Sequence, residues 1–109
     1  VNPTAVRVPV LVGHAESIYI ETEKEIDIEL AKNCLNEFAG ISVIDDVQEV
    51  DFPTSFEHGH GTDDVYVGRI RKGLNKNNSL NLWVVADNVR KGAALNSVQI
   101  AEHLIGSQI

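Results

Sequence analysis

The sequence predicts an α+β or α/β domain, in which a mixed, mainly antiparallel sheet has helices packed on one face. Short stretches rich in Val and Ile recur along the chain, and most are bounded by Gly, Pro or acidic residues, as strands are. Two longer stretches, 27–39 and 89–105, repeat apolar residues at helical spacing. The 109 residues are one domain's worth of sequence, and 43% of them are apolar, which is enough for a core.

The first half of the chain predicts two strands and a helix. Residues 5–12 form an apolar stretch broken by a single charge, which indicates a buried strand. Apolar and polar residues alternate over 17–23, which is typical of a strand with one solvent-facing side. The helix over 27–39 has Asp27 as its N-cap and Gly40 at the position of a left-handed C-cap.

The second half predicts further strands, separated by loops, and a final helix. In chain order these are a strand at 41–44, a stretch at 47–64 that is mostly loop with a short edge strand near 52–56, a strand at 65–71, a loop at 72–79 and a strand at 80–86. Asp87 or Asn88 caps the helix 89–105. Apolar residues cover much more than one face of this helix, so we expect another domain or another copy to cover it.

Composition excludes several partners. The net charge is −7, which opposes binding to a nucleic-acid backbone or to an anionic membrane. The longest apolar runs, Val8 to Val12 and Leu82 to Ala86, are far too short to span a bilayer. The single cysteine fits a reducing compartment, so we predict a soluble, cytoplasmic protein with no nucleic-acid and no membrane partner. Because the sequence contains no methionine, we expect it to be a piece of a longer protein.

Two groups of reactive side chains have structural interpretations. Cys34 lies on the apolar face of the predicted helix, where nothing lowers the pKa of its thiol, so we interpret it as a buried structural residue. A loop with two glycines carries Glu57, His58, His60 and Asp63, which are metal-ligand types. Their spacing is not that of two ligand pairs, so we interpret the loop as solvated and predict no metal.

Arg7 and His14 are the candidates for function. A guanidinium inside an apolar strand needs an anion, and no acidic residue lies within five positions of Arg7. The anion is either an internal carboxylate or a ligand carboxylate or phosphate, which Arg binds with two hydrogen bonds. His14 is the nearest group that can move protons near neutral pH. The glycine at the start of the last helix, Gly92, permits close approach of a partner, although it lacks the spacing of a dinucleotide motif.

Arg7 and His14 can serve one site only if the chain bends between them. Seven residues of straight strand would separate them by about 23 Å and place them on opposite faces. We therefore predict that the strand ends or kinks before His14, at Pro9 and Gly13, and brings the two side chains within about 10 Å of each other.

Three blocks of sequence give the chain a family resemblance. They are residues 5–14 (AVRVPVLVGH), 63–70 (DDVYVGRI) and 80–102 (LNLWVVADNVRKGAALNSVQIAE). In this order and spacing they resemble the C-terminal end of aspartate-β-semialdehyde dehydrogenase. The resemblance implies a catalytic and dimerisation domain similar to that of glyceraldehyde-3-phosphate dehydrogenase, and helix 89–105 packed against an NADP-binding domain that precedes this chain.

The resemblance also implies roles for individual residues. It places the substrate-carboxylate arginine at Arg7, the catalytic histidine at His14 and a nicotinamide contact at Asn96. The implied reaction interconverts aspartyl-β-phosphate and aspartate-β-semialdehyde with NADP and phosphate, on the route to lysine, threonine, methionine and diaminopimelate. The implied assembly is a homo-oligomer, a dimer or a tetramer. Cys34 does not match the motif of the family's nucleophilic cysteine, so we predict that the chain alone is inactive.

Two other classes of function stay open at this point. A small sheet domain with one buried arginine could be an amino-acid-binding regulatory module, or the chain could be a purely structural dimerisation domain. The stretch from Gly92 to Gln99 favours the enzyme, because a sensor has no need of it.

Overall fold

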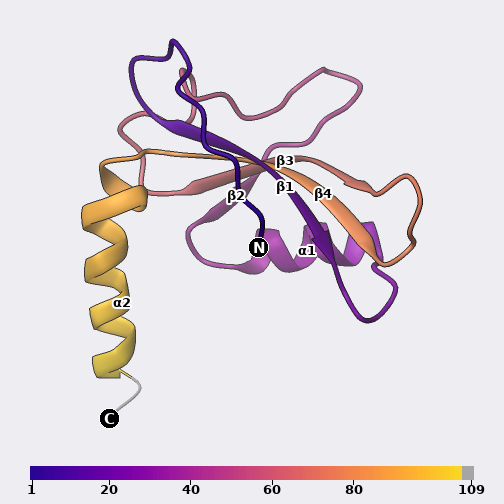
Figure 1. Ribbon diagram of the computed structural model, residues 1–109. Helices are drawn as coiled ribbons and strands as arrows, with labels where there is room; N and C mark the ends of the chain where they lie inside the picture. Colours follow the sequence, from indigo (N-terminus) through magenta and orange to yellow (C-terminus); the bar gives the residue numbers. More distant parts are fainter. Residues whose placement is uncertain (107–109) are drawn as a thin grey trace.

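Four strands form one mixed sheet in the order β1-β4-β3-β2, with a helix on one face and a second helix leading away from it (Figure 1). The computed structural model describes residues 1–106. The elements are β1 (His14–Glu21), α1 (Ile28–Glu37), β2 (Ile41–Val43), β3 (Val65–Lys72), β4 (Ser79–Ala86), the π-helix η1 (Arg90–Ala94) and α2 (Leu95–Gly106). Strand β4 is antiparallel to both β1 and β3, while β2 and β3 are parallel. The predicted mixed, mainly antiparallel sheet is confirmed.

Helix α1 covers one face of the sheet and closes the core. The Asp27 side chain accepts a hydrogen bond of 3.0 Å from the Leu30 N–H, so the predicted N-cap is confirmed. The helix ends at Glu37 with Phe38 as its C-cap, so the predicted cap at Gly40 is wrong; Gly40, with φ +84°, lies in the turn before β2. Apolar residues of α1 pack on the buried cluster formed by Val67, Ile70 and Leu80; they are Ile28, Ala31 and Leu35. This stripe at helical spacing is what holds α1 on the sheet.

The predicted strand over residues 5–12 is wrong, because none of them belongs to a strand. The Val10 N–H donates to the Val8 carbonyl at 2.9 Å and closes a tight turn around Pro9. Val6 is 77% exposed, so the apolar stretch is not buried within the described residues. An apolar run becomes buried only where another segment covers it. The first strand of the sheet, β1, begins instead at His14.

The predicted edge strand near 52–56 is also absent, because none of these residues belongs to a strand and a turn begins at Ser55. The loop instead covers the face of the sheet opposite α1. Pro53 is buried, and its carbonyl accepts a hydrogen bond of 2.9 Å from the Trp83 indole N–H. Gly59 packs on Val85 so closely that a Cβ atom would lie 2.7 Å from the Val85 side chain. The loop therefore acts as a second layer over the sheet.

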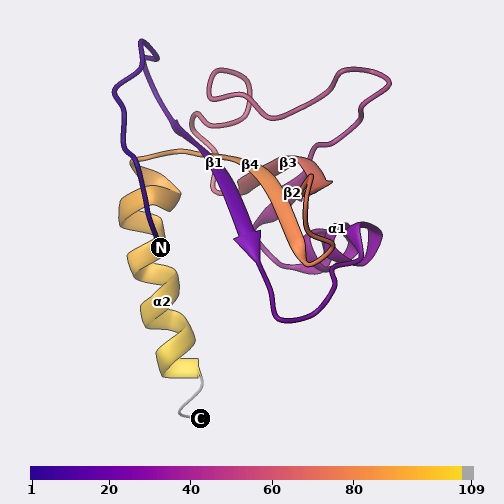
Figure 2. The same cartoon turned by 45° about the vertical axis from the view of Figure 1, so that its right-hand side comes forward.

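The last predicted helix is present, as η1 followed by α2. Figures 1 and 2 show α2 projecting away from the sheet. None of the residues of η1 or α2 is buried, and several apolar side chains of α2 are more than half exposed: Val98, Ile100, Leu104 and Ile105. No helix among residues 1–106 is long and apolar enough to cross a membrane.

Candidate functional site

His14 lies at the start of β1, where it pairs with Ala86 at the end of β4. Its side chain is 44% exposed, and its Nε2 lies 4.0 Å from the Glu16 carboxylate. The imidazole is therefore accessible to a ligand, and it stands at the end of the sheet where the chain leaves β4 for η1.

The Asp87 carboxylate fixes this end of the sheet. Asp87 is only 4% exposed. Its Oδ2 accepts a hydrogen bond of 2.8 Å from the Gly61 N–H, and its Oδ1 accepts from the N–H groups of Arg90 at 3.0 Å and Val89 at 2.8 Å. These three donors hold the pKa of the Asp87 carboxyl below its ordinary value. The predicted cap of the last helix is confirmed at Asp87, which also ties the loop to it.

Asn88 joins the start of β1 to the same junction. Its Oδ1 accepts a hydrogen bond of 3.0 Å from the Gly13 N–H, 75 residues away in sequence. Gly13 has φ +80°, a conformation that other residues rarely adopt. A Cβ atom at Gly13 would lie 2.8 Å from the Gly59 carbonyl oxygen, so the position also leaves no room for a side chain.

Gly92 lies directly against the imidazole of His14. A Cβ atom at Gly92 would lie 2.8 Å from His14 Cε1, 3.6 Å from His14 Nδ1 and 3.3 Å from the Asp87 carbonyl oxygen. The glycine was predicted to permit the close approach of a partner, and the structure identifies that neighbour as His14. The sequence did not predict that Gly92 contacts His14, nor the hydrogen bonds of Asp87 and Asn88. The glycine at position 92 was the only sequence feature that indicated a close contact here.

Arg7 lies on the exposed N-terminal segment and forms no ion pair with any of residues 1–106. The expected location inside a buried strand is therefore wrong, and no internal carboxylate in the described chain meets the guanidinium. The chain turns at Pro9 and has a positive φ at Gly13, the two residues at which a bend was predicted. The approach of the Arg7 and His14 side chains to within about 10 Å, on the same side of the sheet, stays a prediction. Both ribbon views show the segment doubling back before β1 (Figures 1 and 2). Arg7 is thus left with a free guanidinium.

Asn96 lies on α2, four residues after Gly92, and is half-buried. Its side-chain amide forms no hydrogen bond with the part of the chain that the structure describes, from residue 1 to residue 106. Residues four apart lie on the same side of a helix. Asn96 therefore lies about one turn after Gly92, on the same side of the helix as the contact with His14.

Cys34 is exposed, so its interpretation as a buried structural residue is wrong. Helix α1 packs on the sheet through Ile28, Ala31 and Leu35. Cys34 is adjacent in sequence to Leu35, so it is rotated about 100° around the helix axis, and this turns it out of the packed stripe.

Two of the loop's candidate metal ligands, His58 and Asp63, have structural partners. His58 Nδ1 accepts a hydrogen bond of 3.1 Å from the Thr54 N–H, and its ring lies 5.4 Å from the ring of Tyr66. Asp63 forms an ion pair with Arg90. Within residues 1–106 there is no group of three or more His, Cys, Asp or Glu side chains that could hold a metal ion.

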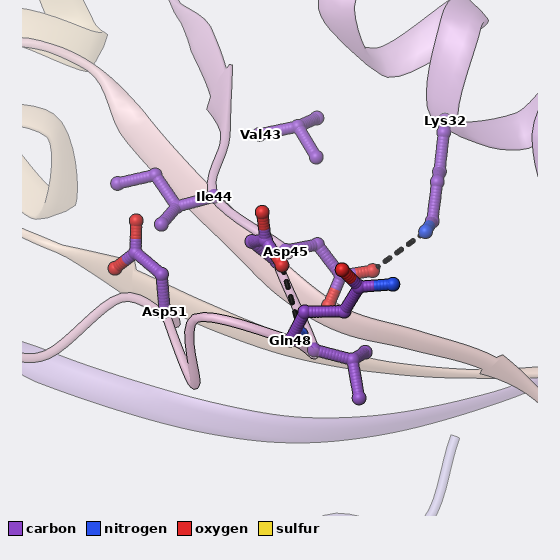
Figure 3. A pocket seen from close by; sticks show the side chains of 8 residues that line it. Lys32, Val43, Ile44, Asp45, Gln48 and Asp51 are labelled. Atoms are coloured by element: carbon purple, nitrogen blue, oxygen red, sulfur yellow. Dashed lines mark hydrogen bonds and ion pairs between the residues drawn. The ribbon is translucent and has the colours of Figure 1, made fainter.

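A depression of about 750 Å³ lies away from His14, beside the end of β2 (Figure 3). Its polar groups are engaged in holding the fold. Asp45 forms an ion pair of 3.0 Å with Lys32 of α1 and accepts from the Arg69 N–H at 2.6 Å, at the irregularity in β3. Asp46 accepts from the Gln48 N–H at 2.8 Å. We assign this depression a structural role.

The lowered pKa of Asp87 predicts an effect of pH on stability. A carboxyl whose pKa is lower in the folded than in the unfolded state stabilises the fold above the unfolded value of about 3.9, and this contribution is lost as the pH falls through the folded pKa. We expect Asp87→Asn to lower the urea midpoint at pH 7, and the deficit to shrink towards pH 3.

Urea denaturation at several pH values measures this effect. Asp63→Asn is the control, because the Asp63 carboxylate has its pKa lowered by Arg90 alone and is half exposed. Its deficit should be smaller at every pH. A deficit for Asp87→Asn that does not change between pH 7 and pH 3 would contradict the assignment.

A comparison of the sequence with models of known protein families shows the class to which the chain belongs. The family described as "Semialdehyde dehydrogenase, dimerisation domain" matches residues 1–91. The match covers most of the chain, which therefore belongs to the semialdehyde dehydrogenase family.

The relatives narrow the family further. The chain is 54% identical over 105 residues to the aspartate-semialdehyde dehydrogenase of Shewanella violacea, covering 96% of this chain and 30% of that protein. It is 51% identical over 105 residues to the enzyme of the same name from Aquifex aeolicus, covering 96% of this chain and 31% of that protein. The chain thus spans about 30% of the length of the curated relatives that it matches.

Solved structures show the same fold. Aspartate semialdehyde dehydrogenase II of Vibrio cholerae, described as complexed with ASA, superposes with a TM-score of 0.87 at 48% identity, over 99% of this chain and 31% of that one. A probable aspartate-semialdehyde dehydrogenase of Pseudomonas aeruginosa superposes with a TM-score of 0.79 at 38% identity, over 93% of this chain and 29% of that one. The predicted family resemblance is confirmed.

Proposed function

We propose that this chain is the C-terminal catalytic and dimerisation part of an aspartate-semialdehyde dehydrogenase, which interconverts aspartyl-β-phosphate and aspartate-β-semialdehyde with NADP and phosphate. The observation that carries this proposal is the similarity to enzymes of that name over nearly the whole chain, in sequence and in fold. The reaction stands at the start of the routes to lysine, threonine, methionine and diaminopimelate.

Arg7 binds the α-carboxylate of the substrate in this proposal. Its guanidinium is exposed and has no ion-pair partner among residues 1–106, so it is available for an anion. Two parallel hydrogen bonds from a guanidinium fix both the position and the orientation of a carboxylate. Holding one end of a four-carbon substrate in this way orients the reacting carbon at its other end.

His14 moves the proton. The nucleophile that the family resemblance implies is a cysteine thiolate outside this chain, since Cys34 does not match its motif. His14 donates a proton to the aldehyde oxygen as the thiolate adds to the carbonyl carbon. It takes that proton back from the resulting hydroxyl as the same carbon gives up hydride, which leaves a thioester on the cysteine. The accessible imidazole at the end of the sheet suits this role, because the substrate can reach it from solvent.

Asn96 would meet the nicotinamide carboxamide. An Asn side chain offers one acceptor and two donor hydrogens, which match a carboxamide, and within residues 1–106 the Asn96 amide is not engaged. Its place one turn after Gly92 puts it on the side of the helix that faces His14, so the residues present fit the nicotinamide end. Bound NADP supplies the hydride acceptor.

The exposed apolar residues of α2 support a two-domain enzyme. Val98, Ile100, Leu104 and Ile105 are each more than half exposed. At about 100° per residue, Val98 and Ile105 lie on one side of the helix and Ile100 and Leu104 on the other, so the helix needs cover on more than one side. In this proposal α2 packs against the NADP-binding domain of the longer protein, and the domain formed by the present chain associates with a second copy.

A chimeric enzyme, called the joined enzyme below, tests the proposal. Residues 1–109 would replace the matching segment of the Shewanella violacea enzyme, and the product would be assayed for phosphate-dependent reduction of NADP with aspartate-β-semialdehyde. We expect turnover by the joined enzyme and none by the chain alone. An equivalent exchange with the Vibrio cholerae segment is the control for the junction. If that control is active and our joined enzyme is folded but inactive, the proposal is wrong.

A further inference from the structure

We propose that Gly92 is a positioning residue for His14: its missing side chain sets where the imidazole stands against the first turn of η1. The inference rests on the proposed function for the role of His14, and on the geometry of this chain for the contact itself.

The contact is specific to one side chain. At Gly92 an added Cβ atom would lie 2.8 Å from His14 Cε1, closer than such atoms come in proteins, while Nδ1 would lie at 3.6 Å. The Asp87 carbonyl oxygen, at 3.3 Å, is the only other atom among the three nearest. Of the three nearest atoms that a methyl group at position 92 would meet, two therefore belong to the imidazole of His14.

The backbone around the contact is fixed on both sides. On the helix side, the Gly92 N–H donates to the Asp87 carbonyl at 2.9 Å, and the Asp87 carboxylate holds the N–H groups of Val89 and Arg90. On the strand side, the N–H of Gly13 is held by Asn88. The two backbones cannot separate without breaking these bonds, so an added methyl group is accommodated by rotation of the imidazole.

This arrangement predicts an unusual pair of effects. Rotation of one exposed side chain costs little stability, and alanine has a better helix propensity than glycine. A displacement of a proton-transfer group by about 1 Å, however, lowers the rate of reaction strongly. Gly92→Ala should therefore leave folding almost unchanged while it impairs catalysis through His14.

The experiment compares Gly92→Ala with Gly106→Ala, because a Cβ atom at Gly106 meets nothing within 4 Å. In the joined enzyme we expect Gly92→Ala to lower kcat about tenfold, to change KM for aspartate-β-semialdehyde less than twofold, and to leave the melting temperature within about 2 °C. Gly106→Ala should change none of these. In the His14→Ala background, Gly92→Ala should have no further effect on kcat, since its effect acts through the imidazole.

NMR of the 109-residue chain gives a readout that does not depend on activity. We expect Gly92→Ala to shift the imidazole resonances of His14 and to leave those of His58 and His103 in place. Unchanged His14 resonances, or a fall in kcat that remains in the His14→Ala background, would overturn the inference. Full activity of His14→Ala would instead contradict the proposed function, and the His14 resonances would still decide whether Gly92 positions the ring.

Discussion

Replacement of His14 by alanine in the joined enzyme is expected to lower kcat for aspartate-β-semialdehyde oxidation by about 10²- to 10⁴-fold, the usual contribution of a proton-transfer group. The imidazole lies at the open end of the sheet and is 44% exposed, so its removal leaves the core intact. KM should change little, because in the proposal Arg7 binds the substrate. Steady-state kinetics at saturating NADP and phosphate measures the effect.

His60→Ala is the matched control for this prediction. His60 is an exposed histidine of the loop, and its replacement removes the same side chain without touching β1. Its kcat should stay within about twofold of that of the unchanged enzyme. An active His14→Ala enzyme, or an equal loss in both variants, would remove the case for His14 as the proton-transfer group.

Replacement of Gly68 by alanine is expected to destabilise the fold by about 3 kcal/mol, near the upper end for overpacking. A Cβ atom at Gly68 would collide with the Ile44 carbonyl oxygen and lie 2.5 Å from the Cδ of Pro53. Both neighbours are rigid, since one is backbone and the other belongs to a buried proline ring. The strain therefore cannot be relieved by rotation of a side chain.

Urea denaturation of the chain measures the loss for Gly68→Ala. Gly106→Ala is again the control, and its midpoint should stay close to that of the unchanged chain. A midpoint for Gly68→Ala that equals the control would show that the loop over 53–59 is not held against the sheet as described.

The sequence predicted the elements whose patterns are local. Alternation predicted β1, although it placed the start at 17 instead of His14. The N-cap Asp27 and the apolar spacing after it predicted α1, although Gly40 placed its end two residues too late. The strand over 5–12 was wrong because an apolar run becomes a buried strand only where another segment covers it, and no segment among residues 1–106 buries this one. Cys34 was misplaced for a related reason: a wide apolar face does not show which of its residues meets the sheet.

The sequence pointed to candidate site residues but not to the contacts around them. Arg7 and His14 came from the residue pattern and from the family resemblance, and Asn96 came from the resemblance alone; their roles stay predictions. The bend at Pro9 and Gly13 came from the distance that a straight strand would impose. The hydrogen bond from Gly13 to Asn88 could not be predicted, because nothing in either neighbourhood indicates a partner at the other end of the chain. Gly92 alone carried a signal, since a glycine inside a helix requires a reason.

The hydrogen bond between Gly13 and Asn88 also bears on the order in which the chain folds. It joins segments 75 residues apart, so it closes a loop that contains α1 and all four strands. Closing long loops is slow, and contacts between distant segments form late unless shorter-range structure has already brought them together. The pairing of β3 with β4 and the packing of α1 involve shorter separations and can precede it. His14 would then meet Gly92 only near the end of folding, so that during synthesis the chain carries the imidazole to which we assign proton transfer long before that imidazole has a defined environment.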